Sequence, residues 1–258
     1  RREVVADWLT SSDNPYFSTS IANRVWAHFM GVGNVDPVDD IRVSNPPSNP
    51  ELFDTLGTKL VEYKFNFKQL VRDICNSKAY QRSKEANPSN AHDQRNYAHA
   101  VVRRIPAESL LDCLSQATGV PDKFRGLPRG ARAVQIADGR TSTYFLTTFG
   151  RSPRTTVCEC EASTEPTLSQ ALHLLNGDAV HRKIIAGKQI QSWMSEGLDA
   201  RAILNKIYIR TLTRMPTDEE AGQLLGNMES LPDDNARRIE LEDIYWAVLN
   251  SREFVFNH

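Results

Sequence analysis

The stretch that decides the fold covers residues 13–31 and reads DNPYFSTSIANRVWAHFMG. Its apolar side chains recur every four residues and therefore share one face of a helix: Phe17, Ile21, Val25 and Phe29. The preceding residues 13–15 combine a capping side chain with a proline, a pattern typical of a helix start. A helix with such a stripe must pack its apolar face against another element.

The same spacing returns along most of the chain. Further apolar stripes lie at residues 52–61, 67–74, 110–114, 168–175, 203–208, 221–228 and 241–249. The stripe at 221–228 follows a capping-box pattern at 217–220, in which the first and last side chains each satisfy a free amide of the other. Because every stripe needs a partner to cover it, the sequence predicts a mainly α, multi-helix packed domain.

One segment, residues 121–163, interrupts the helical pattern. It is rich in arginine, glycine and proline, and the last two favour turns and loops. Runs of alternating residues at 133–136, 143–149 and 155–160 are typical of short strands that pair as a small sheet or hairpin. We therefore expect one irregular, partly β insertion in the helical fold.

The length of the chain fits two domain arrangements. A protein of 258 residues buries roughly 70–75% of its unfolded surface, enough for one large domain or two small lobes. Residues 84–94 are polar and poor in apolar side chains, as expected of a linker. The sequence thus predicts a single domain over residues 1–258, or two lobes: a helical lobe at 1–84 and a second at 95–258 that carries the insertion.

Composition excludes several classes of protein. The net charge of −1 argues against a protein that binds nucleic acid over its whole surface, because affinity for polyanions needs a strong positive field. No run of about 18 apolar residues is present, so no membrane span is expected. Residues 218–243 hold nine acids and two arginines, a formal charge of −7; they form either a solvent-exposed helix face or a docking surface for a partner.

Positive charge is concentrated in the irregular segment. Residues 123–154 carry seven cations against one acid, Asp138, a formal charge of +6. A guanidinium group pairs with carboxylate, sulfate or phosphate through two parallel hydrogen bonds. The candidate ligand-binding residues are therefore Arg129, Arg132, Arg140, Arg151 and Arg154, for an acidic saccharide, a phosphate or the acidic face of a partner. The alternative is that these arginines bond to carbonyl groups of the loops or to the acidic C-terminal helices.

Two thiols follow the basic run directly. Cys158 and Cys160 are candidates for a redox or metal site, because sulfurs two residues apart can bind a soft metal or form a strained disulfide. The alternative is structural: one thiol packs while the other pairs with Cys75 or Cys113. The chain has no CxxCH motif, so we expect no haem c within it.

Asn23 and Arg24 stand on the helix at 13–31, beside its apolar stripe. They either line a cleft or hydrogen-bond to the loop that follows, at residues 36–42. The sequence favours the second interpretation, in which the two side chains hold that loop against the helix.

Several short stretches resemble a known family. They are DWLTS (7–11), DNP (13–15), NRVW (23–26), HFMG (28–31), PVDDI (37–41), PSNPEL (47–52) and WAVLNSREF (246–254). In this order they are similar to the planctomycete-specific PSD-one domain of unknown function. That family is typically found at the C-terminus of large exported proteins, after a cytochrome c domain. The resemblance implies an extracytoplasmic, periplasmic or exported, location and a haem c in an upstream domain of the parent protein.

Three functions remain open on this basis. The first is an accessory module of a cytochrome c-linked protein that binds an anionic ligand or a neighbouring domain through the arginines. The second is a redox or polysaccharide-processing enzyme that uses Cys158 and Cys160. The third is a structural scaffold whose acidic residues 218–243 dock a partner.

Overall fold

The computed structural model describes residues 1–155 and 178–257. It is mainly α-helical, which confirms the predicted fold class. The chain divides into two compact units, residues 1–103 and residues 104–257. Among the described residues, no helix is both long enough and apolar enough to cross a bilayer.

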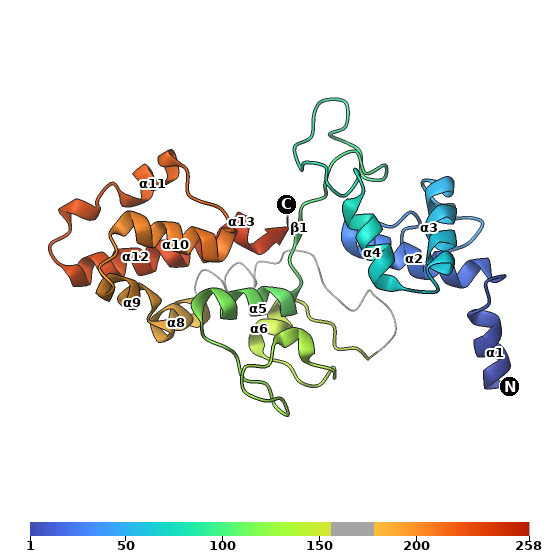
Figure 1. Ribbon diagram of the computed structural model, residues 1–258, viewed down its shortest axis with the longest axis horizontal. Coiled ribbons are helices and arrows are strands. Elements are labelled where there is room, and N and C mark those ends of the chain that lie inside the picture. The colour runs from blue at the N-terminus through green and yellow to red at the C-terminus, as the bar shows by residue number, and fades with distance from the viewer. Residues whose placement is uncertain (156–177, 258) are drawn as a thin grey trace. The chain divides into compact units, whose positions relative to one another are not determined.

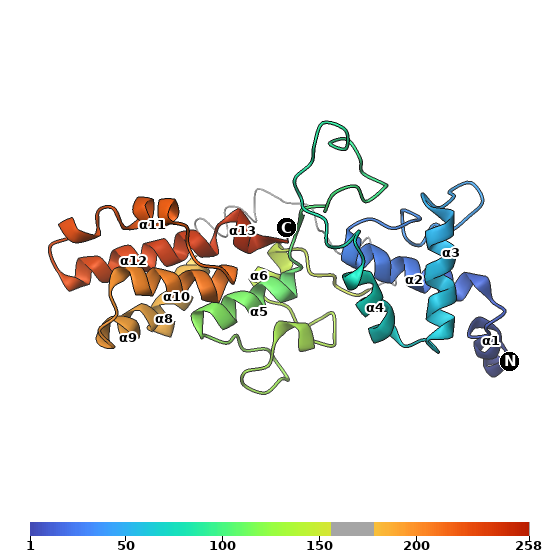
Figure 2. The same cartoon turned by 45° about the horizontal axis from the view of Figure 1, so that its top comes forward.

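Unit 1 contains four helices: α1 (Arg2–Leu9), α2 (Pro15–Met30), α3 (Pro50–Glu62) and α4 (Phe67–Asn76). Asn14 caps α2 by accepting hydrogen bonds from the amides of Tyr16 and Phe17, and Asn49 caps α3 in the same way, so both predicted helix starts are confirmed. Figures 1 and 2 show α2, α3 and α4 packed together. The core of the unit lies between these three helices: Ala22, Trp26, Leu56, Leu60, Leu70 and Ile74.

A long loop, residues 31–49, follows α2 and is fixed by one side chain. The amide of Asn23 is 1% exposed; its Nδ2 donates to the carbonyl of Val35 at 2.9 Å, and its Oδ1 accepts from the amide of Asn34 at 2.8 Å. Arg24 lies 3.8 Å from Asp39 of the same loop. The interpretation that these two side chains hold the loop against the helix is therefore confirmed.

Unit 2 is a larger helical body. Its helices are α5 (Ala107–Thr118), α6 (Tyr144–Thr148), α8 (Asp178–Gly187), α9 (Gln189–Ser195), α10 (Ala200–Leu212), α11 (Asp218–Leu225), α12 (Asp234–Leu249) and α13 (Arg252–Val255). The described part of the unit also contains the 3₁₀ turns Ala133–Gln135 and Met228–Ser230. The strands β1 (Arg103–Arg104) and β2 (Phe256–Asn257) form the one sheet among the described residues. Figures 1 and 2 both show α10 and α12 side by side.

The C-terminal end of α5 is fixed by two side chains from distant helices. Arg210 of α10 donates from Nε to the carbonyl of Ala117 at 3.0 Å, and the hydroxyl of Tyr245 of α12 donates to the same oxygen. These bonds satisfy a carbonyl that a helix end leaves without a partner inside the helix. Burial raises the pKa of Tyr245 to about 12, so this hydroxyl stays a donor at every physiological pH.

The predicted strands at 133–136 and 143–149 are wrong. Ala133–Gln135 is a 3₁₀ turn because the side chain of Gln135 accepts from the amide of Arg132 at 2.8 Å and closes the turn. Tyr144–Thr148 is helical because Thr143 caps it, accepting from the amide of Leu146 at 3.2 Å. The third run, 155–160, lies outside the described residues except for residue 155, and the stripe at 168–175 lies wholly outside them.

Candidate functional site

The basic segment of unit 2 is attached to one face of α5. Glu108, Asp112 and Ser115 are spaced by four and three residues, so they lie one above the other along that face. Each contacts a different part of residues 121–155 or its flank. This ladder of three polar side chains pairs with two arginines of the segment, Arg151 and Arg132, and with the start of the segment through Asp122.

The first rung pairs with Arg151, whose side chain is only 2% exposed. Its Nε lies 3.1 Å from Oε1 of Glu108, and its two Nη atoms each donate at 2.7 Å to the carbonyls of Thr141 and Asp138. A buried guanidinium needs this many acceptors, because an unpaired buried charge is very costly. Arg151 therefore holds the loop around residues 138–141 against α5.

The second rung holds the 3₁₀ turn. The carboxylate of Asp112, which is 8% exposed, accepts from the amides of Ala133 at 2.6 Å and Val134 at 3.3 Å. Arg132 approaches the same carboxylate at 3.4 Å, although its own side chain is 66% exposed. Arg132 therefore has an intramolecular partner but keeps much of its guanidinium in solvent.

The third rung organises the start of the segment. Ser115 donates to Asp122 at 2.8 Å, and Lys183 of α8 donates to the same carboxylate at 2.8 Å. The ammonium group of Lys183 also donates to the carbonyl of Val120 at 2.8 Å and to Ser115 at 3.2 Å. All three N–H groups of this lysine are therefore in use.

Arg154 is also engaged within the protein. Its Nη1 donates to the carbonyls of Ile136 at 3.2 Å and Ala137 at 2.9 Å. Gly139 allows the chain around residue 139 to approach the chain around Pro153 closely, because a Cβ atom at Gly139 would lie 1.8 Å from the carbonyl oxygen of Pro153. Arg151 and Arg154 thus bond to loop carbonyls, as the alternative interpretation of the arginines had it.

The free cations surround a hollow of about 650 Å³, here called the basic hollow. Its charged lining consists of Lys123, Arg125, Arg140 and Asp138, and its polar lining includes Thr141, Ser142 and Thr143. Of the five predicted arginines, Arg140 lines this hollow, whereas Arg129 is exposed outside its lining. Lys123 and Arg125 were not among the predicted residues, although both belong to the same basic run.

Among the described residues, the single acid of the hollow forms no ion pair with its three cations. The carboxylate of Asp138 accepts from the amides of Arg140 at 2.8 Å and Thr141 at 2.6 Å. These hydrogen bonds, chiefly that from Thr141, lower the pKa of Asp138 and keep it ionised. Within residues 1–155 and 178–257, the side chains of Lys123, Arg125 and Arg140 form no hydrogen bond or ion pair.

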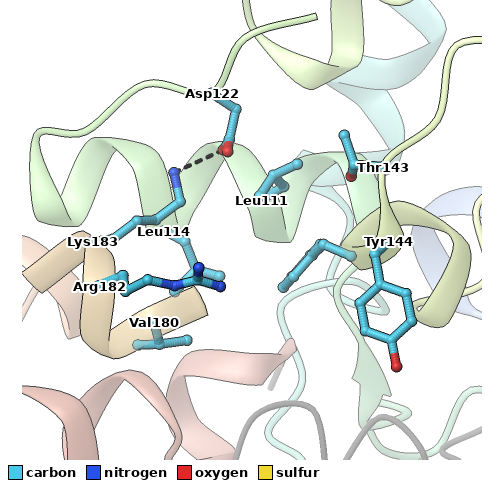
Figure 3. Close-up of a pocket in the computed structure, with 9 residues that line it drawn as sticks. Leu111, Leu114, Asp122, Thr143, Tyr144, Val180, Arg182 and Lys183 are labelled. Atoms are coloured by element: carbon cyan, nitrogen blue, oxygen red, sulfur yellow. Dashed lines mark hydrogen bonds and ion pairs between the residues drawn. The ribbon is translucent and has the colours of Figure 1, made fainter. Parts of the chain in front are cut away.

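A second, smaller cavity adjoins the basic hollow. This apolar pocket has a volume of about 220 Å³, and its lining is Leu111, Leu114, Asp122, Thr143, Tyr144, Phe145, Val180, Arg182 and Lys183. Figure 3 shows Leu114, Arg182, Val180 and the Asp122–Lys183 pair on one side, Thr143 and Tyr144 on the other, and Leu111 between them. Thr143 lines both cavities, so they meet at this residue.

Comparison with known proteins gives one result that bears on identity. A family model described as PSD1, "Protein of unknown function (DUF1553)", matches residues 1–227. The chain belongs to this family. The resemblance predicted from the sequence is thus confirmed, and the match takes in unit 1 and both cavities of this PSD1 chain. No curated protein and no solved structure matches the chain significantly.

The two predicted cysteines of the PSD1 chain, Cys158 and Cys160, lie outside the described residues. Cys75 in α4 is partly buried and Cys113 in α5 is exposed, and both are free thiols. In the described ranges, no three His, Cys, Asp or Glu side chains are grouped closely enough to hold a metal ion. The redox or metal site at Cys158 and Cys160 remains a prediction.

The acidic residues 218–243 are partly used inside unit 2. Arg214 pairs with Glu220 at 2.7 Å and with Glu253 at 2.6 Å. Arg238 pairs at 2.6 Å with Glu242, which is 7% exposed. Arg214 thus links α11 to α13, whereas the Arg238–Glu242 pair lies within α12, and among the described residues these acids pair with no cation of the basic segment.

Proposed function

We propose that this PSD1 domain is a non-catalytic accessory module that binds an anionic ligand in the basic hollow. The observation that carries the proposal is the set of three cations around it, Lys123, Arg125 and Arg140, whose side chains have no partner among the described residues. Arginines that only stabilise loops are bonded to carbonyls, as Arg151 is. The three cations of the hollow have no such partner among the described residues, so their side chains can bind an anion.

The lining suits an anion for two further reasons. Arginine presents a planar fork of donors that matches carboxylate, sulfate and phosphate groups. The hydroxyl groups of Thr141 and Ser142 lie in the same lining and can add hydrogen bonds that carry no charge. The ligand we propose is an acidic saccharide, a phosphate or the acidic surface of a neighbouring domain.

The setting of the module is part of the proposal. The resemblance noted above supports a domain of a large exported protein, outside the cytoplasm, with haem c in an upstream domain. In that setting the module would present the basic hollow to an anionic ligand or to a neighbouring domain of the same polypeptide. It would itself perform no electron transfer.

The test is a binding titration of the full chain with a heparin hexasaccharide at low and at moderate salt. The variant Lys123→Gln/Arg125→Gln/Arg140→Gln removes the cations of the hollow. The control variant Lys188→Gln/Arg237→Gln/Arg252→Gln removes the same charge from exposed positions of unit 2 outside the hollow.

We expect the hollow variant to lose at least tenfold in affinity for the hexasaccharide and most of the salt dependence of binding. At 0.1 M salt an exposed charge acts only within a Debye length of about 10 Å, so charges outside the hollow cannot replace the three that are removed. The control should keep nearly the affinity of the natural chain. Equal losses in the two triple variants would show that net charge alone attracts the ligand, and no binding at low salt would refute the proposal.

A further inference from the structure

The basic hollow and the apolar pocket meet at Thr143, and together they suit one kind of molecule. We propose that they form a composite site for an amphiphilic anion, a single six-membered ring that carries a phosphate, sulfate or carboxylate group. The charged group would occupy the basic hollow and the ring would occupy the apolar pocket. This inference rests on the proposed function and specifies the class of ligand.

The apolar pocket has the size and chemistry for a ring. Its inner surface comes from buried side chains of three elements: Leu111 and Leu114 of α5, Phe145 of α6 and Val180 of α8. An apolar cavity of about 150 Å³ is enough for benzene, and this pocket has about 220 Å³. It is too small for a drug-sized ligand, which usually needs about 300 Å³ or more.

The Lys183–Asp122 ion pair in the lining of the pocket does not compete for the ligand's anion. Lys183 uses all three donors on Ser115, Val120 and Asp122, so this ion pair is satisfied without a ligand. Figure 3 shows the pair at one side, away from Tyr144. Arg182 adds positive charge to the lining and so favours an anionic molecule. The apolar side chains of the pocket therefore select the ring, and Arg182 adds to the preference of the basic hollow for an anion.

The two cavities are close enough for one small molecule. Thr143 belongs to both linings, and Asp122 of one pocket is the sequence neighbour of Lys123 of the other. A ring with its charged group attached directly or through one atom can therefore contact both. Tyr144, which is 74% exposed, lines the apolar pocket and offers an aromatic face to such a ring.

Three probes separate the two contributions: inorganic phosphate carries the charge alone, phenol the ring alone, and phenyl phosphate both. Isothermal titration calorimetry of the full chain should show that phenyl phosphate binds at least tenfold more tightly than inorganic phosphate. The gain comes from removing the ring from water. Phenol should bind more weakly than phenyl phosphate by a similar factor.

Two variants locate the ring. Val180→Phe fills the pocket, and Tyr144→Ala removes an exposed aromatic wall with little risk to folding. Both should bring the affinity for phenyl phosphate close to that for inorganic phosphate and leave inorganic phosphate binding unchanged. Ile185→Phe, at a position of the same helix that is 47% exposed, is the matched control and should change neither.

The outcomes distinguish this inference from the proposed function. If inorganic phosphate binds but the phenyl group adds nothing, the inference is overturned and the anion site stands. If neither phosphate binds, both fall together. If phenol binds as tightly as phenyl phosphate, and the Lys123→Gln/Arg125→Gln/Arg140→Gln variant binds both unchanged, the cavity is purely apolar and the inference is wrong.

Discussion

Replacing Arg151 by methionine is the sharpest test of how the basic segment is held in place. The substitution keeps an unbranched apolar stem in the buried site but shortens the side chain and removes its guanidinium and charge. It leaves the carboxylate of Glu108 and the carbonyls of Asp138 and Thr141 without their donor. Removing one partner of a buried ion pair costs about 3–5 kcal/mol. Because the side chain of Glu108 is 20% exposed and can take up water, we expect the lower end, about 3 kcal/mol.

Scanning calorimetry of the full chain measures this loss. For a unit of this size, each kcal/mol lowers the melting temperature by about 2–4 °C, so the transition of unit 2 should fall by about 6–12 °C. Hydrogen exchange followed by mass spectrometry should show faster exchange in peptides that cover residues 136–151. Arg129→Met is the control, since Arg129 is exposed and unbonded within the described residues, and such surface changes stay within about 0.5 kcal/mol.

The reasoning would be refuted if the two variants melted at the same temperature. The same experiment has a functional arm, because Asp138 and Thr141 also line the basic hollow. Arg151→Met should therefore weaken binding of an anion even though Arg151 does not line the hollow. Unchanged binding in a destabilised variant would show that the hollow does not depend on this support.

Two further predictions concern other contacts. Asn23→Ala should lower the free energy of unfolding by about 2–4 kcal/mol, because it leaves several buried backbone groups unpaired. Hydrogen exchange at residues 31–49 should become faster. Equal exchange rates in the variant and the natural chain would contradict this. Arg214 lowers the pKa of Glu220 from 4.5 to about 2, so the stability from this pair is present above pH 4.5 and is lost as the pH falls toward 2. When the free energy of unfolding is measured against pH, Glu220→Gln should remove about 1 kcal/mol of its decrease in acid. The value is small because the pair is about one-third exposed. A pH profile of the variant identical to that of the natural chain would refute the assignment.

Much of the helical fold could be predicted from local sequence. The starts of α2, α3 and α11 follow from Asn14, Asn49 and the capping box at Thr217, because a capping side chain acts within three residues of itself. The role of Asn23 was predictable for a similar reason, since a polar side chain on an otherwise apolar helix needs a nearby backbone partner.

The irregular segment was less predictable because distant residues determine it. Alternation at 133–136 suggested a strand, but Asp112, 21 residues earlier, draws two amides of that stretch into a turn. Arg151 was a candidate ligand-binding residue, and its burial depends on Glu108, 43 residues away. Charge counts located the basic segment of the chain. They could not show which cations would be paired, because pairing is a property of the tertiary structure.

The ladder of Glu108, Asp112 and Ser115 has a consequence for how this domain can diversify. The side chains that fasten the loops and those that face the hollow are different residues. Lys123, Arg125 and Arg140 can therefore be exchanged by mutation while the contacts that hold the loops persist, so the charge of the hollow can change with little penalty to folding. A protein engineer could use the same separation and treat those three positions as a library on a fixed frame.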